Sequence, residues 1–171
     1  MKKIDTRKLA TLSILISVAM ILSYIESLVP PLVAVPGVKL GLSNIATVFA
    51  LYTLGAPAAV TVSVLRVLLS ALLFGNFVSL LYSISGAALA LAFMLLLKRI
   101  SVFSTVGVSV AGGVAHNAGQ IIAACFVMEN AAIAVYLPPL VISGTLAGVA
   151  IGAASGVLVK KTEKILKFNK K

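Results

Sequence analysis

The sequence predicts an all-α integral membrane protein, a bundle of six transmembrane helices, on the basis of its composition and the placement of its charges. Of the 171 residues, 61% are hydrophobic and 11% are charged, whereas an ordinary soluble domain carries roughly 25% charged residues. A soluble fold of this size could not bury so much apolar surface in one core. Several apolar stretches also reach the roughly 20 residues that a helix needs to cross a bilayer.

Prolines and glycines divide the first half of the chain into three apolar segments. Pro30 and Pro31 end the first segment, because proline cannot continue a helix. A short second segment ends before Gly55, and Pro57 is suited to the first turn of the third helix. The third segment ends at Gly75. These positions predict three transmembrane helices.

Charges and glycines divide the second half in the same way. Lys98 and Arg99 end the fourth segment, and Gly112 and Gly113 make the fifth a candidate for a tilt or a break. The sixth segment precedes the basic residues that begin at Lys160. We expect a single transmembrane domain over residues 1–171. Its predicted spans cover, approximately, residues 9–29, 40–54, 58–74, 78–97, 102–128 and 136–159.

The net charge of +10 comes from basic residues placed outside the apolar segments. All of them other than Lys39 and Arg66 precede the first span, lie between the fourth and fifth spans, or follow the sixth. Six crossings place these clusters on one side, so both termini are expected in the cytoplasm and the protein in the cell membrane as a multi-pass protein. Nucleic-acid binding is disfavoured, because no basic stripe alternates with aromatic residues.

Arg66 is the first candidate site residue, because it lies in the middle of the third predicted span. A guanidinium in hydrocarbon costs at least about 2.5 kcal/mol, so it should face the bundle interior, an acidic partner or a water-filled cavity. Recognition of an anionic ligand is favoured, because arginine offers a rigid bidentate fork to phosphate or carboxylate. The alternative is a structural ion pair, for instance with Glu26.

His116, Asn117 and Gln120 form the second candidate site, midway along the fifth predicted span. Their spacing lets all three border one helix face. Nearby glycines leave room for a ligand or for another helix. A binding pocket is favoured over hydrogen bonds between helices. Metal binding is disfavoured, because one histidine and one cysteine without a nearby carboxylate make a poor ligand set.

The third candidate region is the first predicted outer connection, with Glu26 before it and Lys39 and Asn44 at its end. Proline and glycine impose an irregular path on the stretch from Val35 onward, and irregular backbone at membrane depth is tolerated against protein or a cavity. The connection is a substrate lid or a tight external turn. Glu26 and Asn76 lie toward the outer ends of spans, which indicates a pocket open to the outside.

Three motifs give the chain a family resemblance that extends from about Glu26 to Gly156. They are the sequence PGVKLGLSNI at Pro36–Ile45, the sequence RVLL at Arg66–Leu69, and Gly112–Gln120 with its His-Asn-x-x-Gln core. In this combination the chain resembles the Gx transporter family, whose members look like the substrate-binding S components of energy-coupling factor (ECF) transporters.

The resemblance implies an S-component fold with an outward-facing pocket that captures a vitamin-like or cofactor-like molecule. A flavin is the leading candidate, as riboflavin, FMN or FAD, and Arg66 and Lys39 would suit a phosphorylated form. No cofactor is implied beyond such a bound substrate. The implied partner is an ECF energising module, a transmembrane coupling subunit with ATPases. Its docking pattern, Ala-x-x-x-Ala on the first helix, is replaced here by Ser13 and Ser17.

No catalytic constellation is visible, so the protein is not expected to be an enzyme. There is no Ser/His/Asp set, no Walker-type loop and no pair of aspartates for magnesium. The family is also labelled heptaprenyl diphosphate synthase component I, but Asp5 is the sole aspartate, and prenyl synthesis holds diphosphate through magnesium on aspartate-rich motifs. A non-catalytic accessory subunit in isoprenoid or quinone metabolism is the alternative function.

Overall fold

The computed structural model describes residues 6–28, 41–100 and 102–166, and all regular structure in these ranges is helical. The elements are α1 (Thr6–Leu28), α2 (Asn44–Thr53), α3 (Ala56–Phe74), α4 (Phe77–Arg99), α5 (Thr105–Val127), the 3-10 helix η1 (Ala131–Tyr136) and α6 (Leu137–Leu166). By length and composition α1, α3, α4, α5 and the segment formed by η1 and α6 can each cross a membrane. The predicted all-α membrane fold is confirmed.

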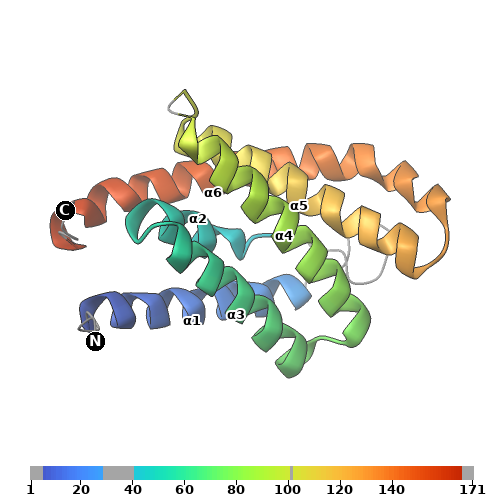
Figure 1. Cartoon of the computed structure of the whole chain (residues 1–171), viewed down its shortest axis with the longest axis horizontal. Helices are drawn as coiled ribbons and strands as arrows, with labels where there is room; N and C mark the ends of the chain where they lie inside the picture. The colour runs from blue at the N-terminus through green and yellow to red at the C-terminus, as the bar shows by residue number, and fades with distance from the viewer. Residues whose placement is uncertain (1–5, 29–40, 101, 167–171) are drawn as a thin grey trace.

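The helices run back and forth along one axis, so that the start of α1 and the end of α6 lie at the same end of the molecule (Figure 1). The packing of α5 against α4 and α6 is the most extensive in the bundle. The short helix α2 contacts α1, α3 and α6, and most of its side chains are buried. A short helix therefore forms the centre of the first half of the bundle.

The helix predicted over residues 40–54 is shorter than expected. It begins at Asn44 and has 10 residues, a rise of roughly 15 Å against a hydrocarbon core of about 30 Å. Gly41 has a φ of +81°, outside the helical region, and a Glu26 carboxylate oxygen accepts its backbone N–H. The chain therefore enters α2 through a non-helical turn.

Two sequence predictions concern the start of α3 and the continuity of α5. Pro57 does lie in the first turn of α3, as predicted. Of the tilt or break predicted near Gly112 and Gly113, the break is wrong, since α5 is continuous over 23 residues. The two glycines are contact points instead: a side-chain carbon on Gly112 would lie 2.7 Å from Met94 Cγ in α4.

Glycines bring α5 and α6 into backbone contact, as small residues do between membrane helices. A side-chain carbon on Gly113 would lie 2.5 Å from the carbonyl oxygen of Gly144. Along α6, a carbon on Gly148 would lie 2.5 Å from Val110 Cα, and one on Gly152 would lie 2.6 Å from Val106 Cα. Gly144, Gly148 and Gly152 of α6 therefore lie at the α5–α6 interface.

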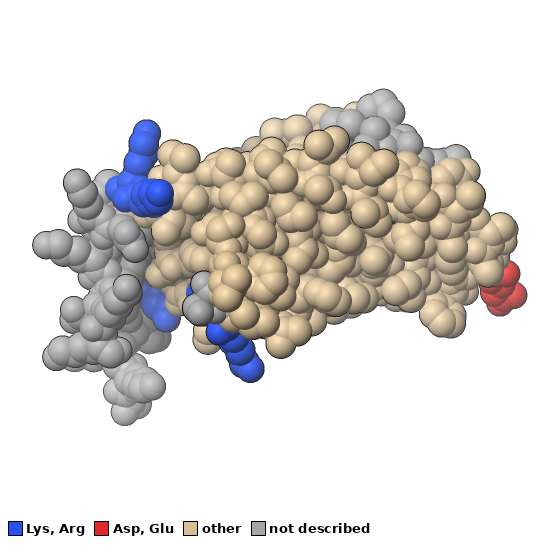
Figure 2. All heavy atoms as spheres, turned by 90° about the horizontal axis from the view of Figure 1, so that it is seen from above, with Lys and Arg blue, Asp and Glu red and all other residues tan. Residues whose placement is uncertain are grey.

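The charged side chains are separated along the long axis of the bundle. Figure 2 shows the visible lysine and arginine side chains gathered toward the end where α1 begins and α6 ends, and an acidic side chain at the opposite end. The long band between the two ends carries exposed apolar side chains from every spanning helix. One basic end is what the positive-inside rule requires, and its cytoplasmic location stays a prediction.

Replacing Gly148 with alanine should lower the thermal stability of the protein in detergent. The added carbon would overlap Val110 Cα, and overpacking of this kind costs about 1–3 kcal/mol. Gly156→Ala on the same helix is the matched control, because no heavy atom lies within 4 Å of a carbon added there. Size-exclusion chromatography after heating measures both variants, and equal losses would contradict the packing at Gly148.

Candidate functional site

A buried carboxylate joins the end of α1 to the start of α2. Glu26, in the last turn of α1, is 5% exposed. Its Oε1 accepts a hydrogen bond from the backbone N–H of Gly41 and a second one, of 3.4 Å, from that of Leu42. Gly41 suits this place because a residue with a side chain rarely adopts its φ of +81°. The carboxylate therefore sets the position of the turn that leads into α2.

Arg66 extends the same cluster from α3. Its side chain is 4% exposed, and Nη1 donates a 2.5 Å hydrogen bond to Ser43 Oγ. The Glu26 carboxylate acts electrostatically on the guanidinium. The arginine therefore faces the bundle interior and experiences the charge of an acidic group, and its recognition of an anionic ligand stays a prediction.

One edge of the Arg66 guanidinium has no protein partner among the residues that the structure describes. Nη1 bonds to Ser43, whereas Nε and Nη2 form no hydrogen bond to any described group. The N–H bonds of Nε and Nη2 lie in the guanidinium plane and point outward, nearly parallel, along one edge. This geometry binds two oxygens of a carboxylate or phosphate. The arrangement can therefore receive a planar or tetrahedral oxyanion.

The His116 imidazole of α5 lies near α4 and near the turn that leads into α2. A side-chain carbon on Gly41 would lie 3.4 Å from His116 Cδ2, and one on Gly86 would lie 3.0 Å from His116 Cε1 and 2.9 Å from Gln120 Cγ. His116 and Gln120 are 2% and 0% exposed. Asn44 Nδ2 is also close to Gly41, 2.9 Å from the same added carbon. Two glycines thus make room for the imidazole and bring it next to the turn held by Glu26.

These residues form one buried group, which we call the polar centre. It combines side chains from α1, the start of α2, α3 and α5. Its members are Glu26, Ser43, Asn44, Arg66, His116 and Gln120.

Asn117 does not belong to the polar centre, although the sequence predicts one face for it, His116 and Gln120. Its Nδ2 donates a 2.7 Å hydrogen bond to the Leu140 carbonyl of α6 and lies 3.5 Å from Ser143 Oγ. Adjacent residues of a helix are about 100° apart around its axis, so Asn117 faces α6 while His116 faces α4. The prediction of one shared face is wrong.

Two further predicted site residues lie elsewhere. Asn76 is exposed and is the N-cap of α4: its Oδ1 accepts the Ser79 N–H at 2.8 Å, and Ser79 Oγ accepts the Asn76 N–H. This capping box satisfies the first turn of α4 and explains Asn76 without a ligand. Lys39 and residues 35–40 of the connection, which was predicted to be a lid or a tight turn, lie outside the described residues.

Ser43 is the member of the polar centre that sequence reasoning did not select. It is at the N-cap of α2, where a serine normally accepts a backbone N–H of the first turn. Here it makes no capping bond and accepts from Arg66 instead. The sequence signal that could have identified Ser43 is a hydroxyl residue at a predicted helix start, directly before the candidate Asn44.

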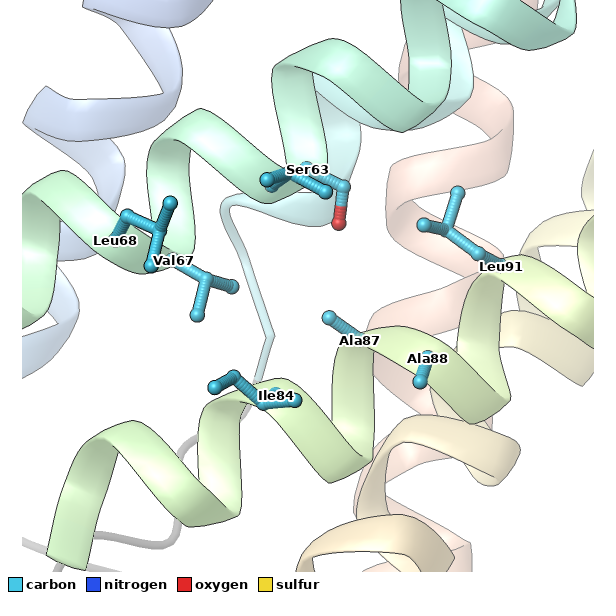
Figure 3. A pocket seen from close by; sticks show the side chains of 8 residues that line it. Ser63, Val67, Leu68, Ile84, Ala87, Ala88 and Leu91 are labelled. Carbon is cyan, nitrogen blue, oxygen red and sulfur yellow. The ribbon is translucent and has the colours of Figure 1, made fainter.

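An apolar groove separates α3 from α4 on another side of these helices (Figure 3). It has a volume of about 320 Å³. Its lining residues are Ser63, Val64, Val67 and Leu68 of α3, and Ile84, Ala87, Ala88 and Leu91 of α4. Of these lining side chains, that of Ser63 alone is polar.

Comparison with known proteins agrees with the resemblance predicted from the sequence. Residues 15–158 match the sequence model of the family described as heptaprenyl diphosphate synthase component I. The fold matches a solved chain described as "Structure and mechanism of the S component of a bacterial ECF transporter", with a TM-score of 0.56 and 20% identity over 95% of this chain and 98% of that one. No curated protein matches. The predicted S-component fold is confirmed.

Glu26→Gln should destabilise the protein by about 3–5 kcal/mol, because it leaves the buried Arg66 guanidinium without its neighbouring negative charge. The glutamine keeps the shape of the side chain and a carbonyl oxygen for the Gly41 N–H. Adding Arg66→Gln should cost less than the sum of the two single changes, by about 0.5–3 kcal/mol. Denaturant titration of the four proteins in detergent measures this coupling, and strictly additive losses would show that the two charges act independently.

Proposed function

The chain belongs to the family described as heptaprenyl diphosphate synthase component I, and from that premise we propose that it is the substrate-binding subunit of an ECF-type transporter. Its fold is that of an S component. Six of its buried polar side chains gather in one centre, and they include a carboxylate and a guanidinium. Buried ionisable groups in membrane spans commonly mark substrate pathways. The polar centre is therefore the proposed binding site.

The observation that carries this proposal is the open edge of Arg66. A guanidinium that is 4% exposed and has two N–H-bearing nitrogens without a described partner is costly to bury unless a further acceptor arrives. Glu26 balances its charge only in part, because the carboxylate also accepts two backbone N–H groups. We therefore propose that the substrate is a small organic anion, with Arg66 binding its phosphate or carboxylate.

The other members of the polar centre have proposed roles around this anion. His116 and Gln120 come from the same face of α5 and would contact the body of the substrate. Ser43 holds Nη1 and so fixes the direction of the open edge. Glu26 holds the turn that carries Ser43, which makes it a positioning residue for Arg66.

A flavin or flavin nucleotide is the first substrate that we propose to test. The phosphate of FMN would accept both hydrogen bonds from Nε and Nη2 of Arg66. The described aromatic side chains that could stack on its ring are partly engaged: Tyr24 forms an edge-to-face pair with Phe74 at 5.5 Å between ring centroids, and Tyr82 is 1% exposed. Ring stacking would need one of them to turn.

A second function, favoured by a different observation, is a non-catalytic membrane subunit in isoprenoid or quinone metabolism. The family description names a prenyl diphosphate. The groove between α3 and α4 is almost wholly apolar and would suit a hydrocarbon chain. In this second function the polar centre would bind a lipid head group.

The proposed partner is an ECF energising module that docks on α1. Ser13 and Ser17 are exposed one turn apart. Their hydroxyls donate to the carbonyls of Leu9 and Ser13 in the same helix, at 3.1 and 3.0 Å. The pair therefore presents a small, internally satisfied surface on which another membrane helix could pack closely.

Arg66→Gln should remove an anionic small molecule that co-purifies with the wild-type protein. Loss of a bidentate hydrogen bond to a charged group should weaken its binding about 10- to 100-fold. Mass spectrometry of the extracted ligand, and titration of the purified protein with FMN followed by flavin absorbance, measure the effect.

Arg99→Gln is the matched control, because Arg99 is exposed in the last turn of α4, at the basic end. Equal ligand content in wild type and Arg66→Gln would contradict the proposed site. A ligand without flavin absorbance that still depends on Arg66 would exclude the flavin and keep the site.

Ser17→Leu should reduce co-purification of the protein with an ECF coupling subunit by about tenfold, because a bulky side chain keeps the two helix backbones apart. Leu9→Ile is the control, since Leu9 is exposed on the same helix and the substitution leaves the side-chain volume unchanged. Pull-down from membranes that contain both subunits measures the complex. Undiminished recovery of the Ser17 variant would exclude this surface.

A further inference from the structure

The α3–α4 groove has a buried floor and a rim that faces away from the bundle. At the floor, Ser63 and Val67 are 2% and 3% exposed, and Ala87 is 6% exposed. At the rim, the apolar side chains are about half exposed, namely Val64, Leu68 and Ile84. Because α3 and α4 are both long and apolar enough to span the membrane, the rim opens sideways into lipid hydrocarbon and not into water.

Each wall of the groove carries a lining residue whose neighbour in the sequence contacts the polar centre. On α3, Val67 lines the groove and its neighbour Arg66 bonds to Ser43. On α4, Ala87 lines the groove and its neighbour Gly86 lies against the His116 ring. Figure 3 shows the stretch that leads into α2 running behind the groove, between the two helices. The turn into α2, which supplies Ser43 to the polar centre, therefore lies behind the groove.

The chemistry of the groove restricts what it can hold. Ser63 is the single lining side chain with a polar group, and its hydroxyl points into the opening (Figure 3). A flavin ring has several polar edges that would find no partners here, and unpaired polar groups are costly in an apolar site. A hydrocarbon chain has no such requirement. The volume of about 320 Å³ corresponds to roughly ten groups of about 30 Å³, each near the size of a water molecule, which is enough for one hydrocarbon chain.

We propose that the groove receives the hydrocarbon chain of a single-chain anionic amphiphile whose phosphate or carboxylate head group binds the open edge of Arg66. This inference rests on the proposed function of Arg66, and it names the substrate class. The ligand enters sideways from the bilayer, and its head reaches the polar centre between α3 and α4. The head group is recognised by hydrogen bonds and charge, whereas the chain is recognised by the shape of the groove, since lipid itself is equally apolar.

The test uses the full-length protein in phosphatidylcholine nanodiscs, with dodecyl phosphate carrying a diazirine at the end of its chain. After illumination, mass spectrometry of the digested protein locates the label. We expect it to concentrate on α3 and α4 residues of the groove in the wild-type protein. Unlabelled dodecyl phosphate should compete, and methyl phosphate, which lacks the chain, should compete at least tenfold less well.

Two variants with one matched control separate the chain from the head group. Ala88→Leu fills the groove and should reduce labelling about tenfold. Ala92→Leu adds the same side chain one turn further along α4, at an exposed position outside the lining, and should leave labelling unchanged. Arg66→Gln should also reduce labelling about tenfold, because it removes the head-group contact.

The remaining outcomes would contradict the groove, its link to the polar centre, or the proposed function. Label spread evenly over the lipid-facing helices, or equal labelling of the Ala88 and Ala92 variants, would exclude the groove. Equal labelling of the wild-type protein and Arg66→Gln would exclude the link between the groove and the polar centre. If FMN or methyl phosphate binds in an Arg66-dependent way while dodecyl phosphate does not label the groove, this inference fails and the proposed function stands. If no anion depends on Arg66, both fail.

Discussion

The pairing of a carboxylate and a guanidinium inside a transmembrane bundle is the constraint on which the rest of the site depends. Either charge alone would be costly at membrane depth. Glu26 is stabilised by two backbone N–H groups and acts on Arg66, which in turn holds Ser43. This chain of contacts fixes α1, α2 and α3 relative to one another. It also explains why α2 begins only at Asn44. The backbone N–H groups of Gly41 and Leu42, which precede the helix, bond to Glu26.

Glycine placement decides where the bundle is tight and where it is open. Gly113 and Gly144 bring the backbones of α5 and α6 together, and Gly86 lets α4 approach the His116 ring. Between α3 and α4 the facing residues are mostly valine, leucine and isoleucine, so the two backbones stand further apart and contact each other less. The groove follows directly from this difference, because larger side chains separate helices that glycines would let touch.

The resulting site has two parts with opposite chemistry. The polar centre offers charge and hydrogen bonds in a dry interior, where electrostatic contacts are strong. The groove offers shape to an apolar group and opens to the bilayer. A molecule that carries both an anionic and an apolar part would use both. Two residues that the sequence analysis selected for the site make other contacts. Asn117 bonds across the α5–α6 contact, and Asn76 caps the start of α4.

The sequence by itself determined the membrane class, the approximate helix positions and the candidates Glu26, Arg66, His116 and Gln120. These follow from local properties: long apolar segments, flanking charges, and polar residues that are conspicuous within them. Which helix each side chain faces was decided only by the tertiary structure. A rotation of about 100° per residue separates neighbours in a helix, and the packing of distant glycines sets that rotation. Hence the hydrogen bond from Arg66 to Ser43, the length of α2 and the groove could not be inferred before the helices were placed together.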